Sequence, residues 1–333
     1  MVNRELGLVI NGNSNYSNYT FDPLTFSCLL SFGPLIYIIP TFVVIIRVIR
    51  TFYRNIIGKK DKNVNRNVFT VLVLSNFSSL GFFFSDLIVI RAPSTGIMTS
   101  WCYRQEPNRF LNIVFQAQAY FNYCTMFYPV LFSVVRLVIT YVPNRHDEVN
   151  AKILKFAIPA IQIYPILLLL HMIPALGVCR QHSSPYSFGA VYVHFINSWR
   201  GIMNAPITVI NSAVWLTTCL ILNFILYRKL RKLKTVSLSQ TQTHQNIRNR
   251  IIEVSLSLTT LAMLFAYATN LVFLGSFMID YDVATYLVVF RPFGYDLELC
   301  VVPWVFYLTH PAFRKKSDSR IVVNSNRKPH LSV

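Results

Sequence analysis

The chain has 333 residues, of which 53% are apolar and only 13% are charged, and its mean hydropathy is +0.44. Soluble domains carry about 25% charged residues, because their whole surface meets water. This chain has too little polar surface for that, so we expect lipid to cover the remainder. A net charge of +18 in a soluble protein would indicate nucleic-acid binding. Here the basic residues lie between long apolar runs, which favours a membrane protein without a nucleic-acid partner.

A helix that spans the bilayer needs about 20 mostly apolar residues, because the hydrocarbon core is about 30 Å thick. Seven stretches meet this requirement and predict an all-α, seven-transmembrane helix bundle. They are Leu24–Val48, Val68–Ile90, Leu111–Tyr141, Ile153–Pro174, Asn204–Tyr227, Ile251–Phe277 and Val283–Leu308. Buried core helices of a large soluble protein are the alternative, but seven such lengths in one chain are difficult to explain in that way.

The distribution of Lys and Arg predicts the orientation, because these residues are retained on the cytoplasmic side. The gaps after the first, third and fifth spans and the carboxyl-terminal tail hold 21 of the 31 Lys and Arg residues, whereas the remaining gaps and the amino terminus hold six. We therefore expect residues 1–23 to be extracellular, residues 24–308 to form the bundle and residues 309–333 to be a cytoplasmic tail. The first span then serves as the insertion signal.

Two further patterns agree with an extracellular amino terminus. Asn15 and Asn18 each begin an Asn-X-Ser/Thr sequon, which is glycosylated only on the lumenal side. Cys102 and Cys179 lie in outer gaps, where an oxidising compartment favours a disulfide between the second outer loop and the start of the third span. Two free surface thiols are the alternative. The other cysteines fall within spans, where we expect small buried side chains: Cys28, Cys124, Cys219 and Cys300.

Seven spans in this orientation are typical of G-protein-coupled receptors, although topology alone does not establish function. The stretch RPFGYDLE at 291–298, followed by VPWVFYLTHPAFRKK at 302–316, resembles the end of the nematode serpentine chemoreceptors of the gamma superfamily. The opening, NYTF at 18–21 leading to YIIPT at 37–41, is most similar to serpentine receptor class U, with class gamma and class V as close alternatives. The resemblance covers about residues 15 to 316. It implies a plasma-membrane receptor for a small external chemical, a heterotrimeric G protein as partner and no cofactor.

The general receptor motifs are only partly present. At the inner end of the third span, Arg136 aligns with the arginine of the usual acid-Arg-aromatic triplet, but Val135 replaces the acid and Leu137 the aromatic residue. Arg136 is a candidate for the G-protein switch; an interfacial arginine that snorkels to the headgroups is the alternative. Without the acid, Arg136 needs another partner to stabilise the inactive state. A degenerate receptor that no longer signals is a further alternative. Pro303 and Tyr307 match the usual Asn-Pro-x-x-Tyr motif loosely, and this proline predicts a hinge.

Ionisable residues inside spans are costly in lipid and are therefore functional candidates. Asp86 lies near the outer end of the second span. The candidates in the last span are Arg291, Asp296 and Glu298. We expect Asp86 and Arg291 to pair across the outer bundle beside a ligand cavity; a purely structural ion pair is an equal alternative. Tyrosines of the third span are weaker candidates for the pocket wall, because the chain has 18 tyrosines: Tyr120, Tyr123 and Tyr128.

Other functional classes fit less well. The seven histidines show no metal-ligand spacing and no His-Glu-x-x-His motif, so neither an enzyme nor a metal site is expected. A transporter would show more spans or inverted repeats. A ligand-gated channel of the insect odorant type has seven helices but an internal amino terminus. A ligand-gated channel or a transporter-like protein therefore stays the alternative to a receptor. The basic and polar loop 228–250 suits G-protein contact and phosphorylation, although a solvated flexible loop explains the same charges.

Overall fold

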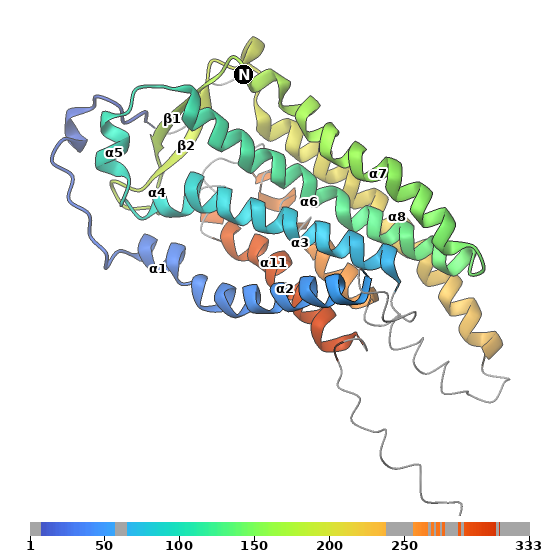
Figure 1. The fold of residues 1–333 in the computed structure, drawn as a ribbon. Helices are drawn as coiled ribbons and strands as arrows, with labels where there is room; N and C mark the ends of the chain where they lie inside the picture. The colour runs from blue at the N-terminus through green and yellow to red at the C-terminus, as the bar shows by residue number, and fades with distance from the viewer. Residues whose placement is uncertain are drawn as a thin grey trace, which may run out of the picture.

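In the computed structural model, long helices run side by side and a two-stranded β-hairpin lies at one end of them (Figure 1). The structure describes residues 8–56, 65–237, 256–265, 268–269, 271–273, 275–276, 286–287, 290–310 and 313. The long helices are α2 (Leu35–Ile56), α3 (Arg66–Asp86), α6 (Arg109–Tyr141), α7 (His146–Leu169), α8 (Asn204–Ser237) and α11 (Arg291–Thr309). The shorter elements are η1 (Ser14–Tyr16), α1 (Phe26–Phe32), η2 (Leu87–Arg91), α4 (Ala92–Ser94), α5 (Thr99–Arg104), η3 (Leu170–Met172), β1 (Leu176–Gln181), β2 (Val191–Ile196) and η4 (Trp199–Gly201).

Five helical stretches of the described chain are long and apolar enough to cross a membrane. They are Phe26–Arg54, Arg66–Ser94, Arg109–Tyr141, His146–Met172 and Asn204–Arg231, and they coincide with the first five predicted spans. The sixth predicted span is described as the shorter apolar helix Leu256–Phe265 and a few isolated residues, and the last one as α11. A mostly helical multi-span protein is thus confirmed, whereas the number seven stays a prediction.

Several helix boundaries differ from the predicted spans. The fourth span begins at His146 rather than Ile153, because Asp147 and Glu148 occupy its first turn, where negative charge is favoured by the helix dipole. The helix of the fifth span runs to Ser237, ten residues beyond the predicted end, since the basic residues there are good helix formers. The start of the last span at Val283 lies outside the described residues. For the fourth and fifth spans, hydropathy predicts the apolar part of the helix and misses the polar, charged extension.

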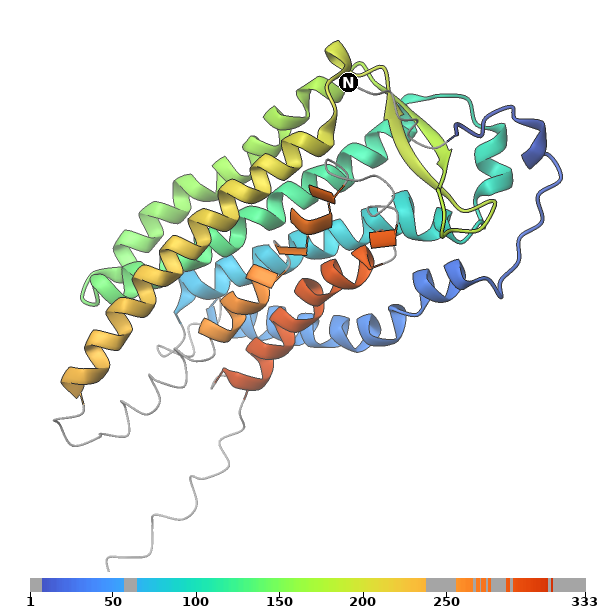
Figure 2. The same ribbon diagram turned by 180° about the vertical axis from the view of Figure 1, so that it is seen from behind.

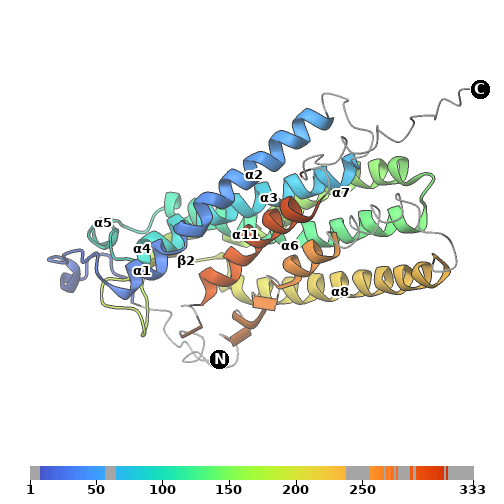
Figure 3. The same ribbon diagram turned by 90° about the horizontal axis from the view of Figure 1, so that it is seen from below.

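Helix α6 is the centre of the described bundle, because it packs against α3, α7 and α8 (Figure 3). Helix α3 in turn packs against α2 and α11. The main core cluster joins Phe132 and Val135 of α6 to Leu72 of α3 and Phe306 of α11. Helices α7 and α8 instead bury few of their apolar side chains and leave most of them exposed or partly exposed, as expected for faces that meet lipid.

The prediction of an all-α fold missed the hairpin. Strands β1 and β2 pair antiparallel from Leu176↔Ile196 to Gln181↔Val191 and lie at one end of the bundle (Figure 2), the end that the sequence analysis predicts to be extracellular. Within β2, Val191, Val193 and Phe195 are buried while the residues between them are half-buried, the two-residue period of a strand. A search for apolar runs of membrane-spanning length does not detect so short an alternation.

Close backbone approach fixes the hairpin to the start of α6. Asn108 and Gly177 exchange two backbone hydrogen bonds of 3.1 and 2.8 Å. A Cβ atom on Gly177 would collide with the backbone of Leu111 and Asn112, so only glycine permits this contact. The side chain of Asn108 also accepts a hydrogen bond from the Leu111 amide and caps α6. The strand therefore has a defined position relative to the central helix.

Candidate ligand cavity and buried ionic network

A cavity of about 640 Å³ lies beneath the hairpin. Its walls come from the hairpin, from α6, from the α3–η2 region and from the first turns of α8, with Phe273 and Tyr295 completing the described lining. This volume falls within the range of about 300–1,000 Å³ that is typical of small-molecule sites. The described elements therefore leave space for a small ligand at the hairpin end of the bundle.

The wall on the hairpin side is polar and basic. Arg180, Tyr192 and His194 lie on one strand face, because side chains alternate along each strand and Arg180 pairs directly with Tyr192. Burial, together with the nearby Arg180 cation, lowers the pKa of His194 to about 3, so this imidazole is neutral at physiological pH. The apolar part of the lining includes Phe82 and Phe115, and the Phe115 ring lies 5.5 Å from the His194 ring between centroids. Among the lining residues that the structure describes, none is acidic.

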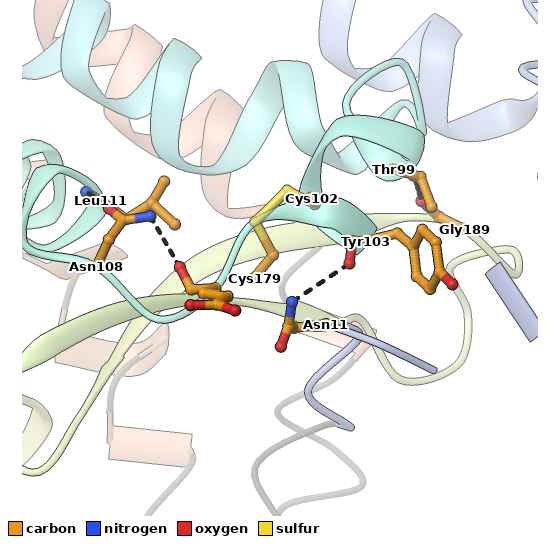
Figure 4. The surroundings of a disulfide bond; sticks show 9 residues. Asn11, Thr99, Cys102, Tyr103, Asn108, Leu111, Cys179 and Gly189 are labelled. Atoms are coloured by element: carbon orange, nitrogen blue, oxygen red, sulfur yellow. Dashed lines mark hydrogen bonds between the residues drawn. A yellow bond between two sulfur atoms is a disulfide. The ribbon is translucent and has the colours of Figure 1, made fainter. Parts of the chain in front are cut away.

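The hairpin is anchored by a disulfide between Cys102 and Cys179, with Cα atoms 5.8 Å apart (Figure 4). The bond joins β1 to α5, the connection that the positions of the two cysteines predict. The hydroxyl of Thr99 in α5 also donates a hydrogen bond to the Gly189 carbonyl. The side-chain amide of Asn11 donates to the Tyr103 carbonyl over 3.3 Å. The amino-terminal segment, α5 and the hairpin thus form one cap, which we call the outer cap after its predicted extracellular side.

A buried ionic network lies next to the cavity, because Ile90 and Tyr295 of the cavity lining directly precede Arg91 and Asp296 of the network. The guanidinium of Arg91 contacts Asp86 over 2.8 Å through Nε and Asp296 over 2.6 Å through Nη2. Asp296 also accepts a hydrogen bond from the Tyr37 hydroxyl over 2.5 Å, and Asp86 accepts one from the Gln118 amide over 2.6 Å. Asp86, Arg91 and Asp296 are all at most 3% exposed. The network therefore connects α2, α3, η2, α6 and α11.

The position of Arg91 corrects the sequence analysis, which counted this residue among the outer-loop bases. The helix does not end at Ile90: α3 continues through η2, a π-helical turn, into α4. A π-helix places residues i and i+5 about one turn apart, so Arg91 folds back onto Asp86. The only signal in the sequence was the absence of a turn residue between Asp86 and Pro93. The side chain of Arg291 lies outside the described residues, so its pairing with Asp86 stays a prediction.

Gln118 connects the cavity to the network, because it lines the cavity and its Nε2 atom donates to Asp86. Glu298 lies elsewhere, beside a second space of about 10 Å³ whose lining includes Ser79 and Asp296. That volume holds about one water molecule, so it is not a ligand site. Asp86, Asp296 and Glu298 therefore do not belong to the described lining of the large cavity. Asp86 accepts a hydrogen bond from Gln118 of that lining, and Asp296 directly follows the lining residue Tyr295 in sequence.

The three candidate tyrosines of α6 bridge helices and are not part of the described cavity lining. The hydroxyl of Tyr120 donates to Gln162 on α7 over 2.5 Å, and Gln162 donates to the Tyr128 hydroxyl over 2.9 Å. The hydroxyl of Tyr123 meets Asn204 and Thr208 on α8, both at 2.9 Å. Asn204 and Thr208 do line the cavity, so Tyr123 supports its wall from behind.

At the opposite end of α6, Arg136 is 1% exposed and points into the bundle, which excludes the snorkelling alternative for this conformation. Its guanidinium donates to the hydroxyls of Thr260 and Ser257, both over 2.8 Å, and to the Leu256 carbonyl over 3.2 Å. All three acceptors belong to the helix Leu256–Phe265. Hydroxyl and carbonyl groups thus hold Arg136 where the usual motif has an acid.

The last helix is attached to α2 near the same end. Trp304 donates its indole N–H to the Thr41 hydroxyl over 3.0 Å, and Arg47 donates to the Tyr307 hydroxyl over 3.1 Å. Pro303 lies inside α11, directly before Trp304. The glycosylation candidates Asn15 and Asn18 are exposed on the outer cap. Both the hinge and the glycans stay predictions.

Long apolar helices around a capped cavity define a multi-pass membrane protein with the architecture of a GPCR-like receptor. A family model described as "Serpentine type 7TM GPCR chemoreceptor Sru" matches residues 10–316. The chain is also 36% identical over 261 residues to "Serpentine receptor class U-26" of Caenorhabditis elegans, an alignment that covers 78% of this chain and 88% of the relative. The chain therefore belongs to the Sru family of serpentine chemoreceptors, as its opening and its last helix predicted.

Proposed function

We propose that this chemoreceptor lies in the plasma membrane with its amino terminus outside, binds a small external chemical in the 640 Å³ cavity and activates a heterotrimeric G protein. The family supports a bundle of seven spans and a chemosensory role. The distribution of basic residues supports the orientation. The disulfide supports it too, because the bond belongs to an oxidising compartment and lies at the cavity end.

The observation that carries the proposal is that one helix, α6, joins both candidate sites. Gln118 and Asn122 line the cavity, and Arg136 lies 14 residues further along the same helix. This separation corresponds to about 21 Å of helix axis, enough to cross most of a bilayer. A ligand that shifts α6 at its outer end can therefore change how Arg136 is held by Thr260 at its inner end.

The test is expression in a reporter cell line with a panel of small volatile and water-soluble chemicals. We expect an active compound to trigger G-protein signalling in the native receptor, and Arg136→Ala to abolish this signal while compound binding is retained. Arg145→Ala is the matched control, because Arg145 is exposed near the same end of the bundle and contacts only Glu148 among its described ion-pair partners.

The alternative is a ligand-gated channel or a transporter-like protein, and the same cells distinguish it. A ligand-evoked cation current that persists when G proteins are inhibited, and that Arg136→Ala leaves unchanged, would contradict the proposed function. Uptake of the compound by the native receptor would contradict it equally.

A further inference from the structure

We propose that an anionic phospholipid binds along α2 and that Arg47, Arg50 and Arg54 hold its phosphate groups. The site lies outside the cavity, at the end of α2 remote from the hairpin (Figure 1), and it does not depend on which chemical the receptor detects. All three arginine side chains are exposed, at intervals of three and four residues. Residues at these intervals are neighbours on one helix face, so the three arginines form a continuous basic stripe.

An exposed apolar surface leads into the basic stripe. It consists of four residues at helical spacing on the same side of α2: Ile36, Ile39, Val43 and Ile46. The helix axis rises by about 15 Å from Ile36 to Ile46, which is about the hydrocarbon thickness of one leaflet. A phospholipid whose acyl chains lie along this surface therefore places its headgroup at the level of the arginines.

The face of α2 that carries the stripe is accessible to lipid. Helix α2 lies at the edge of the described bundle, where it packs against α3 and α11 (Figure 3). Its other face supplies the buried residues Ile38, Ile45 and Val48. A lipid can therefore reach the stripe without displacing a described helix.

The described part of the chain does not neutralise the stripe. None of the three arginines forms an ion pair with a described acidic residue. Arg47 instead donates to the Tyr307 hydroxyl over 3.1 Å, so Tyr307 can donate its own proton to a phosphate oxygen. Guanidinium groups bind phosphate through paired hydrogen bonds, and three of them suit a headgroup with more than one negative charge.

Basic residues that only fix the orientation of a membrane protein need neither a lipid-facing position nor an unpaired charge. Arg145 and Lys152 illustrate this case, because both pair with Glu148, over 3.2 and 2.8 Å. The arginines of α2 differ in both respects, since they continue a lipid-facing surface and have no described acid beside them. An anionic leaflet attracts such bases near its surface.

The test measures lipid binding by the full-length receptor, purified in an uncharged detergent. The probes are dispersed phosphatidylcholine, phosphatidylserine and phosphatidylinositol bisphosphate. We expect the affinity to increase in that order, because the negative charge of the headgroup increases. Arg50→Gln with Arg54→Gln should lower the affinity for phosphatidylinositol bisphosphate by about 30-fold, or about fivefold for each base removed. Neither side chain has a described hydrogen bond or ion pair, so the unfolding temperature in phosphatidylcholine should match that of the native receptor.

Soluble inositol trisphosphate distinguishes a lipid site from a site for free phosphate. It carries the same type of headgroup without acyl chains, so it should bind at least about tenfold more weakly than the lipid. Equally tight binding of inositol trisphosphate would overturn the inference.

The matched control is Arg145→Gln with Lys152→Gln, which removes the same charge from exposed bases that Glu148 already neutralises. We expect this variant to change the affinity for phosphatidylinositol bisphosphate by about twofold or less. Equal losses in the two double variants would overturn the inference, because net charge alone would then explain binding. An unchanged affinity in the Arg50 and Arg54 variant, or equal affinities for phosphatidylcholine and phosphatidylinositol bisphosphate, would overturn it as well.

Discussion

Arg91 decides the charge balance inside the bundle. It is the one described cation between two buried carboxylates, Asp86, five residues away in sequence, and Asp296, 205 residues away. Such a cluster costs desolvation energy when it forms, and it becomes strongly destabilising when one partner is removed, because an uncompensated charge is then buried. The network thus adds an ionic connection between α3 and α11 that a single guanidinium completes.

Replacement of Arg91 by methionine should therefore lower the free energy of unfolding by about 3–5 kcal/mol. Thermal unfolding of the purified receptor and its abundance at the cell surface measure this effect. The triple variant Arg91→Met with Asp86→Asn and Asp296→Asn should recover most of the loss, because no net charge stays buried. An Arg91→Met receptor as stable as the native one would show that the network does not form.

Gln118 gives a second prediction, on signalling. Gln118→Leu removes a hydrogen bond to a carboxylate, which is worth about 1.5–3 kcal/mol, and separates the cavity from the ionic network. We expect it to lower both stability and the maximal response to an active compound. Gln116→Leu is the control, because Gln116 bonds only the neutral Met172 carbonyl among its described partners and should cost about 1 kcal/mol without loss of response. Equal responses from both variants would contradict the role of Gln118.

At the scale of elements, the contact between α6 and the helix Leu256–Phe265 replaces the missing acid at the inner end. Thr260→Val with Ser257→Ala removes the two 2.8 Å acceptors of Arg136 while it preserves side-chain volume. We expect the double variant to signal without added compound, because the arginine is released from the closed arrangement. Thr259→Val, on the same helix, is the control, because Thr259 is not among the described acceptors of Arg136. Basal signalling that stays at the native level would contradict a holding role for these hydroxyls.

The hairpin gives a prediction on pH. The pKa of His194 is lowered to about 3 in the folded protein, so below its ordinary value near 6.5 the unfolded chain binds a proton that the folded chain does not. Stability of the outer cap should therefore fall as pH decreases from about 7 towards 4. His194→Gln should reduce this pH dependence, measured as the difference in unfolding temperature between pH 7.5 and pH 5. An unchanged pH dependence in His194→Gln would show that this imidazole is not buried beside Arg180.

The elements also show what a sequence can reveal. Hydropathy correctly predicts the five described helices of membrane-spanning length, because a span requires a run of about 20 mostly apolar residues that is easily recognised in the sequence. The positions of the cysteines predict the disulfide, because only Cys102 and Cys179 lie in predicted extracellular segments between spans. The hairpin and the buried Arg91 were missed, since one depends on six-residue alternation and the other on a π-helical turn. Such features arise from tertiary contacts and have no periodicity of useful length.

At the scale of the whole molecule, the central helix α6 joins the outer cap and the cavity beneath it to Arg136 at the opposite end. The cap contains residues far apart in sequence: Tyr16 stacks on Phe188 at 4.7 Å, and its hydroxyl bonds Gln181 over 3.2 Å. The amino-terminal segment thus packs on the same surface as the hairpin and the disulfide. All of these parts must face the same side of the membrane for an external chemical to reach the cavity.

The most direct test of this arrangement is the accessibility of two epitope tags, one before Met1 and one after Val333, on cells that express the receptor. An odd number of crossings with the cap outside predicts that antibodies label the amino-terminal tag on intact cells and the carboxyl-terminal tag only after permeabilisation. Asn15→Gln with Asn18→Gln should also increase electrophoretic mobility, because both exposed sequons then face the lumen during synthesis. Labelling of both tags under the same condition, or of the amino-terminal tag only after permeabilisation, would contradict the account.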